Sequence, residues 1–213
     1  MATASWCCVL VLTTVLFCLP RSRPIIAYAA NQITFAPSVT KVADLILSKL
    51  PGKFNGAHLR IEPDFSIAFG NTPLSLFINA MKSFGYNSEA PVYVASGVFT
   101  SEDTSEQANV TGTLVINEVV STVLHKKQFV PRGTLQGLTS EQLALIDLLV
   151  LSRADKVVGH CQSSFSWFLM EWRALHGLPR NTSHLIQVPR CAQTDAWKGS
   201  NRFEIFNGGF LFA

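Results

Sequence analysis

The stretch that decides the fold is Thr139-Ser-Glu-Gln-Leu-Ala-Leu-Ile-Asp147-Leu-Leu-Val-Leu-Ser152, in which Asp147 is the one charge inside the otherwise apolar run 143–151. Thr139 and Gln142 match the capping-box pattern, in which each side chain hydrogen-bonds the backbone of the other at a helix start. A helix is therefore predicted to begin at this point. Residues 156–160 then form a short run of strand-forming residues.

A second helix is predicted directly after that strand. Ser163 and Ser164 can cap its start, and Gly177 and Pro179 are typical of its end. The N-terminus of a helix leaves backbone N–H groups without partners, so it can bind a phosphate group. The stretch thus predicts helix, strand, polar turn and helix, with a possible anion site at the turn.

Composition limits the remaining choices. The chain has 213 residues, of which 48% are hydrophobic and 15% are charged, which suits one good core or one domain plus a tail. The formal net charge is only +3. No block of Lys or Arg is present, so the sequence does not favour a nucleic acid partner.

The N-terminus predicts a leader over residues 1–30. The apolar run Trp6–Leu19 is short for a membrane span and long enough for the core of a signal peptide, and Ala27-Tyr-Ala29 resembles a cleavage site. A signal peptide is the main interpretation; a membrane anchor and a mis-assigned gene start are the alternatives. The expected organisation is leader 1–30, domain 31–188 and tail 189–213, in a protein of the endoplasmic reticulum or Golgi lumen, which would meet the membrane only through an uncleaved leader.

Two further features bear weakly on location. Cys161 and Cys191 remain once the leader is set aside, and they could pair in an oxidising compartment. Asn109-Val-Thr and Asn181-Thr-Ser match the acceptor pattern for N-glycosylation, so a glycoprotein is expected.

Helices and strands are predicted to alternate along the rest of the chain. Helices are expected over 39–50, capped by Ser38, and over 73–84, capped by Thr72. The buried stripe of the second helix is expected to consist of Leu74, Phe77, Ile78, Met81 and Phe84. Residues 101–109 are expected to form a short helix or a loop. The expected strands are 56–61, 91–95 and, more weakly, 114–116 and 123–129, and Glu62–Asp64 should open a loop. This pattern predicts an α/β fold with a Rossmann-like, mainly parallel sheet and helices on both faces.

Ligands of such sheets bind beyond the C-terminal ends of the strands, where His58, Arg60, Ser96 and Ser164 are expected. The fork of Arg60 suits a phosphate or carboxylate, or it could pair with nearby Glu62 or Asp64. His58 should share a strand face with Arg60 and could bind a phosphate, or it could be a core histidine bonded to a backbone carbonyl.

Asp147 and Ser164 also have two interpretations each. The carboxylate of Asp147 could accept two N–H bonds from a guanine edge, or it could bond another buried group. Ser164 could contact a phosphate oxygen or simply cap its helix. The sequence contains no metal-binding motif, so no metal site is expected.

These residues resemble a known family. His58-Leu59-Arg60 resembles the His-Leu-Arg motif of the GDP-fucose protein O-fucosyltransferases, and residues 147–168 resemble their C-terminal nucleotide-binding segment, with Asp147 and Ser164-Phe165 at the family's spacing. The resemblance covers about residues 33–185 and implies a GT-B fold. It implies an inverting transfer of fucose from GDP-fucose to a Ser or Thr hydroxyl of a protein acceptor, with no essential metal and no other cofactor.

The resemblance also assigns residues to this reaction. It places His58 and Arg60 at the diphosphate, with Arg60 as the catalytic residue that eases departure of GDP, and it includes Leu59 among the residues that bind GDP-fucose. It places Asp147 at the guanine and Ser164 and Phe165 at the nucleotide-sugar phosphates. The family's N-terminal Gly-rich loop does not precede His58, so the chain is expected to be the donor-binding half.

Two alternatives remain open. The chain could be a non-catalytic protein that binds nucleotide sugars or other partners. It could also be a hydrolase that uses Ser164 with His58 or His160 and Asp155, although the Gly-x-Ser-x-Gly turn of such enzymes is absent.

Overall fold

The structure is a computed structural model that describes Tyr28 and residues 30–100, 104–131, 133–186, 188 and 191. Residues Thr34–Val188 form one compact unit, and the fold is described for this unit alone. The predicted leader 1–30 and tail 189–213 fall almost wholly outside the described residues and stay predictions.

A five-stranded parallel sheet forms the centre of this unit, in the order β3-β2-β1-β4-β5. All its strands are short, and three of them are buried along their whole length. The strands are β1 (Asn55–His58), β2 (Val92–Ala95), β3 (Val123–Leu124), β4 (Val157–His160) and β5 (Ser183–Ile186). The predicted parallel α/β fold is confirmed.

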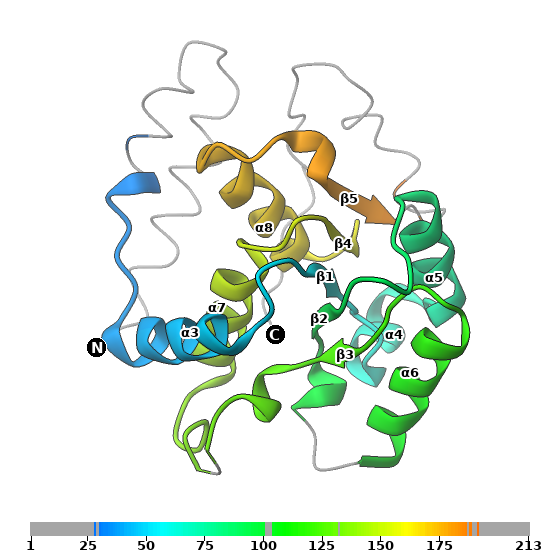
Figure 1. The fold of residues 1–213 in the computed structure, drawn as a ribbon, viewed down its shortest axis with the longest axis horizontal. Helices are drawn as coiled ribbons and strands as arrows, with labels where there is room; N and C mark the ends of the chain where they lie inside the picture. Colours follow the sequence, from blue (N-terminus) through cyan, green and yellow to red (C-terminus); the bar gives the residue numbers. More distant parts are fainter. Residues whose placement is uncertain are drawn as a thin grey trace. The chain divides into compact units, whose positions relative to one another are not determined.

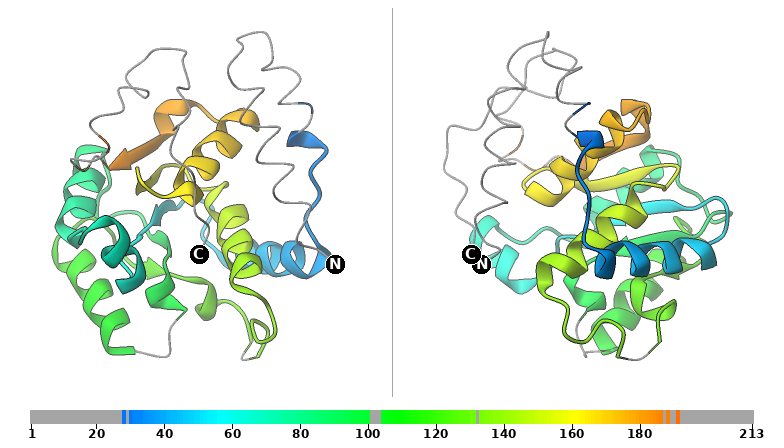
Figure 2. Two further views of the ribbon diagram at one scale, coloured as in Figure 1. Left: turned by 180° about the vertical axis from the view of Figure 1, so that it is seen from behind. Right: turned by 90° about the vertical axis from the view of Figure 1, so that its left-hand side faces the viewer.

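Helices cover both faces of the sheet (Figures 1 and 2). Connections between parallel strands are right-handed, so strands added on opposite sides of β1 send their helices to opposite faces. Accordingly α5 and α6 lie on one face, and α3, α7 and α8 lie on the other. The helices are α3 (Pro37–Lys49), α4 (Pro63–Phe69), α5 (Leu74–Ser83), α6 (Thr104–Ile116), α7 (Ser140–Leu151) and α8 (Ser164–Leu175).

The stretch from Thr139 to Gly177 forms the predicted helix, strand and helix, although Ser163 makes no side-chain cap bond. Thr139 and Gln142 form the capping box at the start of α7, where each side chain bonds the backbone of the other. Strand β4 follows, and α8 begins after Ser163 and ends before Gly177, whose positive φ of 85° is the left-handed conformation that glycine adopts most easily.

The main core lies between the sheet and the helices α5 and α6. Phe77, Ile78 and Met81 are the buried residues of the stripe predicted for α5, and Leu74 and Phe84 pack partly buried beside them. Burial of this apolar surface is the main favourable contribution to the stability of the fold. It also fixes the positions of β1 and β2, whose ends carry most of the candidate residues.

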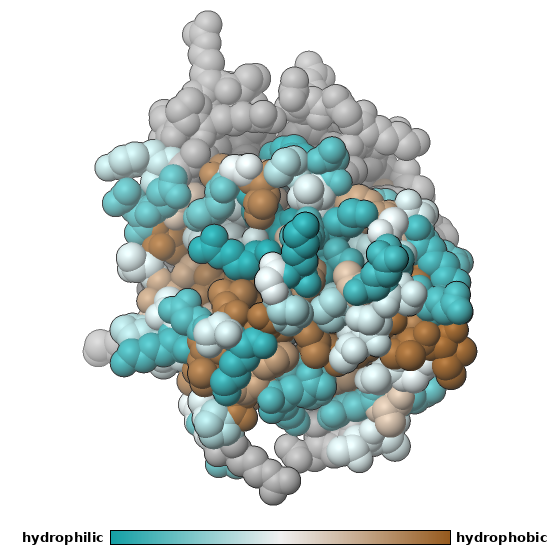
Figure 3. Space-filling view, viewed as in Figure 1, coloured by the Kyte–Doolittle hydropathy of each residue, from teal (hydrophilic) through white to brown (hydrophobic). Residues whose placement is uncertain are grey.

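Two predictions about local structure are wrong. Residues 114–116, expected as a strand, are the last turn of α6, in which Leu114 is buried while Val115 and Ile116 are 41% and 82% exposed. Figure 3 shows apolar surface at the right-hand edge, where α6 lies in Figure 1. The expected loop at Glu62–Asp64 is instead the start of α4, because Pro63 suits the first position of a helix.

Two predicted helix caps are also wrong. Helix α3 starts after Ala36, with Ser38 inside its first turn, and α5 starts after Pro73. Thr72 therefore makes no cap, and its hydroxyl lies 2.9 Å from Nε2 of His160. The Thr72 hydroxyl thus bonds a histidine that is distant in the sequence instead of the backbone at the start of α5.

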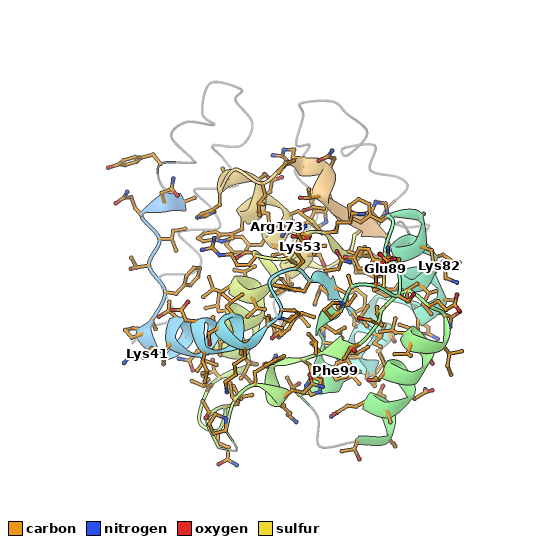
Figure 4. All side chains as sticks on the ribbon, in the orientation of Figure 1. Lys41, Lys53, Lys82, Glu89, Phe99 and Arg173 are labelled. Atoms are coloured by element: carbon orange, nitrogen blue, oxygen red, sulfur yellow. The ribbon has the colours of Figure 1, made fainter. Side chains whose placement is uncertain are left out.

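Strand β5, which the sequence did not indicate, is attached by a buried arginine (Figure 4). Arg173 on α8 is 1% exposed and donates to backbone carbonyls at the end of α7, including Leu151 at 3.0 Å and Ala154 at 2.7 Å. It also donates to Ser183 Oγ at 3.0 Å, at the first residue of β5. One side chain thus links α7, α8 and β5.

Cys161 and Cys191 are each disulfide-bonded. Among the helices that the structure describes, none combines the length and apolar character needed to cross a bilayer.

Candidate functional site

The candidate site lies where the strand order reverses, between β1 and β4. The connection after β1 leads to the α5 face, and the connection after β4 leads to the α8 face. The two connections therefore diverge at the C-terminal ends of these neighbouring strands. In open parallel sheets this point forms the crevice in which ligands bind. His58 ends β1 and His160 ends β4.

His58 is held on the α8 side of the sheet. Its Nδ1 lies 2.7 Å from Oγ of Ser166, and its ring packs on that of Phe165 with centroids 4.4 Å apart. The residue is 8% exposed. Burial, together with the positive charge of Arg60, lowers the pKa of His58 to about 3, so its imidazole is neutral at physiological pH.

His160 is wholly buried and fully hydrogen-bonded. Its Nδ1 accepts from the Gln162 N–H at 3.1 Å, so the ring proton is on Nε2, which donates to the Thr72 hydroxyl. Burial lowers its pKa to about 4. Neither His58 nor His160 bonds Ser164 within the described part of the chain, so the structure does not assemble the serine hydrolase alternative.

Arg60 lies beyond the end of β1, so strand alternation does not set its direction relative to His58. Its guanidinium bonds both Glu62 Oε2 at 3.0 Å and Asp64 Oδ2 at 2.8 Å, and it lies over the ring of Phe65. The alternative prediction, that Arg60 pairs with a nearby carboxylate, is therefore confirmed for both Glu62 and Asp64. The Arg60 side chain nevertheless keeps 32% exposure, so it remains accessible to a ligand.

Glu62 connects the ends of β1 and β2, a role that the sequence did not reveal. Its Oε1 accepts from the Ser96 hydroxyl at 2.9 Å and from the backbone N–H of Gly97. A Cβ atom at Gly97 would approach this carboxylate to 2.8 Å, so glycine permits the contact. Ser96, one of the expected site residues, therefore acts through Glu62 to hold Arg60 in place.

The N-terminus of α8 completes the same end of the sheet. Ser163 is the N-cap but makes no side-chain hydrogen bond, so the first N–H groups have no side-chain cap. Ser164 is exposed and Phe165 is half-buried. Leu59, by contrast, is wholly buried in the core, and its backbone N–H bonds the carbonyl of Ala95.

Asp147 occupies a different environment from the other candidates. It is 4% exposed, and its two oxygens accept from the Tyr93 hydroxyl at 2.7 Å and from Nζ of Lys126. Burial and the adjacent carboxylate raise the pKa of Tyr93 well above its ordinary value. This arrangement favours a structural role, and guanine binding by Asp147 stays a prediction.

The described residues include no group of three or more His, Cys, Asp or Glu side chains placed to hold a metal ion. Metal independence of the chemistry stays a prediction. The groups brought together at the switch point are a neutral histidine, an arginine and the start of a helix, which together suit an anion with several oxygens.

Comparison with known proteins finds similarity at the level of fold. No protein-family model matches the chain. No curated protein matches it. Two crystal structures of POFUT1 in complex with GDP, a GDP-fucose O-fucosyltransferase with the GT-B fold, superpose with a TM-score of 0.48 each and 15% and 16% sequence identity. The matches cover 80% of this chain and 51% and 52% of those chains, so the chain spans about half the length of these solved structures.

Proposed function

We propose that this chain binds GDP-fucose and provides the donor-binding half of an inverting, metal-independent glycosyltransferase. The acceptor would be a Ser or Thr hydroxyl of a protein. The observation that carries the proposal is the convergence of His58, Arg60 and the N-terminus of α8 at the switch point of the sheet. A diphosphate carries the charge and the several oxygens that this set of donors can bind.

Arg60 is the proposed catalytic residue. When the bond between fucose and GDP breaks, negative charge develops on the leaving diphosphate, and a positioned guanidinium stabilises this charge. Donors at the start of α8, near Ser164, would add to this effect and take the part that a metal ion plays in other enzymes. Phe165 would help to hold the donor in place, and Leu59 would fix the backbone between His58 and Arg60.

Calorimetry with GDP and GDP-fucose tests the proposed site. The wild-type protein should bind both, and Arg60→Ala should abolish binding. Arg153→Ala is a matched control, because Arg153 is exposed at the end of α7, outside the proposed site. Equal binding by wild type and Arg60→Ala would show that the site is assigned wrongly. Absence of GDP binding by wild type would refute the proposed function itself.

A non-catalytic nucleotide-sugar-binding protein is the second candidate. One observation favours it: Glu62 and Asp64, the two carboxylates beside Arg60, are both already bonded and would be poor bases for an acceptor hydroxyl. Release of GDP from GDP-fucose in the presence of candidate acceptors separates the two functions. Binding without turnover by the folded chain would favour the second.

We also propose that the chain works in the lumen of the endoplasmic reticulum or Golgi. The disulfide-bonded state of Cys161 and Cys191 supports an oxidising compartment. Asn109 and Asn181 are both exposed and so accessible to glycosylation. Expression in mammalian cells followed by peptide N-glycosidase digestion should shift the electrophoretic mobility; an unchanged band would argue against this location.

A further inference from the structure

Ser166, on the first turn of α8, bridges the two central strands through its hydroxyl. Its Oγ accepts the backbone N–H of His160 at 3.0 Å and lies 2.7 Å from Nδ1 of His58. Gly159 makes this approach possible, because a Cβ atom there would come within 2.6 Å of the same Oγ. Ser166 lies within the segment 147–168, but the resemblance assigns it no role.

The position of one hydrogen atom follows from these contacts. Ser166 is 0% exposed, so water does not reach its hydroxyl. Among the described residues, the only acceptor in reach of the Ser166 hydroxyl hydrogen is Nδ1 of His58. The hydroxyl therefore donates to Nδ1, and a neutral imidazole that accepts at Nδ1 carries its own proton on Nε2.

The Nε2 atom of His58 is available for a ligand. It has no hydrogen-bond partner among the described residues. It is also absent from the buried unsatisfied polar atoms of this part of the chain, so it reaches the surface. Phe165 packs against the ring and restricts its rotation.

We propose that Ser166 is a positioning residue that fixes His58 as an Nε2–H donor directed at an anionic oxygen of the ligand. This proposal rests on the proposed function for the identity of the ligand, a nucleoside diphosphate, but its statement about the tautomer does not. The low pKa of His58 agrees with it, since burial and, after it, the positive charge of Arg60 oppose a second ring proton. His58 therefore supplies a hydrogen bond without adding positive charge.

The consequence for recognition is specific. If His58 carried its proton on Nδ1 instead, Nε2 would present a lone pair to the ligand and repel a phosphate oxygen. Loss of the Ser166 hydroxyl would allow both tautomers and would leave only part of the protein able to bind. Ser166 thus acts on binding through His58, without itself touching the ligand.

Long-range ¹H–¹⁵N NMR on the full-length protein tests this directly, because it reports which ring nitrogen carries the proton. The His58 signals, assigned by their loss in His58→Gln, should show an Nε2–H tautomer in wild type. Ser166→Ala should give a mixture of tautomers, and Ser166→Thr, which keeps a hydroxyl, should restore the wild-type pattern. Ser183→Ala is the matched control, a buried serine that bonds Arg173; it should leave the His58 signals unchanged.

Calorimetry with GDP then measures the effect on binding. We expect Ser166→Ala to raise the Kd for GDP about 3- to 10-fold, the usual effect of one hydrogen bond, and Ser166→Thr to recover most of the affinity. An Nδ1–H tautomer in wild type, or an unchanged tautomer in Ser166→Ala, would overturn the proposal. The wild-type measurement keeps it falsifiable if Ser166→Ala does not fold. A wild-type protein that shows the expected tautomer but does not bind GDP would refute the proposed function and leave the inference about Ser166 standing.

Discussion

Arg60 and Arg173 are two cations in opposite settings. Arg173 is almost fully buried and has no carboxylate within salt-bridge distance among the described residues. Its N–H groups donate to backbone carbonyls and to two hydroxyls. Arg60 lies at the end of the sheet, half-exposed, and bonds two carboxylates. The first arrangement leaves no donor for a ligand, whereas the second holds the guanidinium by contacts that a ligand can replace.

The difference separates a residue that builds the fold from one that can bind a ligand. The C-terminal carbonyls of a helix carry partial negative charge, so Arg173 compensates its own burial at the end of α7. Arg60 instead pairs with Asp64, whose side chain is 68% exposed, and an exposed ion pair contributes little to stability. The two arginines should therefore respond to mutation in different measurements.

The largest expected effect is on stability at Arg173. Arg173→Met keeps an unbranched, buried side chain but leaves several carbonyls without donors. We expect the free energy of unfolding, measured with urea, to fall by about 3–5 kcal/mol. Arg153→Met, at an exposed position at the end of α7, is the control and should cost less than about 0.5 kcal/mol. Equal losses in the two variants would show that the buried contacts of Arg173 contribute no more to stability than an exposed arginine does.

The next effect concerns the two histidines beside the site. Their pKa values in the folded protein are about 3 for His58 and about 4 for His160, below the ordinary 6.5, so between these values the unfolded chain binds more protons. Stability should thus be constant with respect to these groups above pH 6.5 and fall as the pH is lowered. At pH 5 each should cost on the order of 2 kcal/mol.

Urea unfolding at pH 7 and pH 5 checks this expectation. In His58→Gln, the free energy of unfolding should differ less between pH 7 and pH 5 than in wild type, because the contribution of His58 is removed. If wild type were equally stable at both values, the two rings would not be neutral and buried as described. The result would also show whether the stability of the end of the sheet near Arg60 depends on histidines that are neutral when folded.

Much of this architecture was predictable from local pattern. The capping box at Thr139 and the helix end at Gly177 depend on neighbouring residues, and the structure confirms both predictions. Strand β5 and the roles of Arg173 and Glu62 were not, because they depend on contacts between segments far apart in the chain. The motif His58-Leu59-Arg60 located one edge of the site, but only the fold shows that Leu59 is buried and that Arg60 is paired.

Asp147 shows the same limit. A carboxylate in an apolar helix indicates either a ligand or a buried partner, and the sequence alone does not choose between them. The partners Tyr93 and Lys126 come from β2 and from the turn after β3, at 54 and 21 residues' separation. Their spacing in the sequence carries no periodic signal that could reveal this network.

A smaller effect should distinguish the shape of the Arg60 head group from its charge. Arg60→Lys keeps the charge but loses the planar fork that contacts two oxygens at once. We expect the Kd for GDP to rise about 10-fold, with the free energy of unfolding changed by less than about 0.5 kcal/mol. Calorimetry and urea unfolding on the same preparation measure both. A large loss of stability would place Arg60 in the same class as Arg173.

The smallest expected effect is an increase in affinity. Asp64 bonds the terminal nitrogen of Arg60 at 2.8 Å and adds a negative charge where a diphosphate would have to bind. Asp64→Asn removes that charge, so less work is needed to replace the contact, and GDP should bind about 2- to 5-fold more tightly. Glu62→Gln should have the opposite sign, because Glu62 holds Arg60 and the end of β2 together. The gain at Asp64 should also shrink as salt is added, since the exposed carboxylate is screened. Weaker binding by Asp64→Asn at low salt would show that Asp64 positions Arg60 for the ligand, and the Arg60–Asp64 contact would then belong, like those of Arg173, to the permanent framework of the fold.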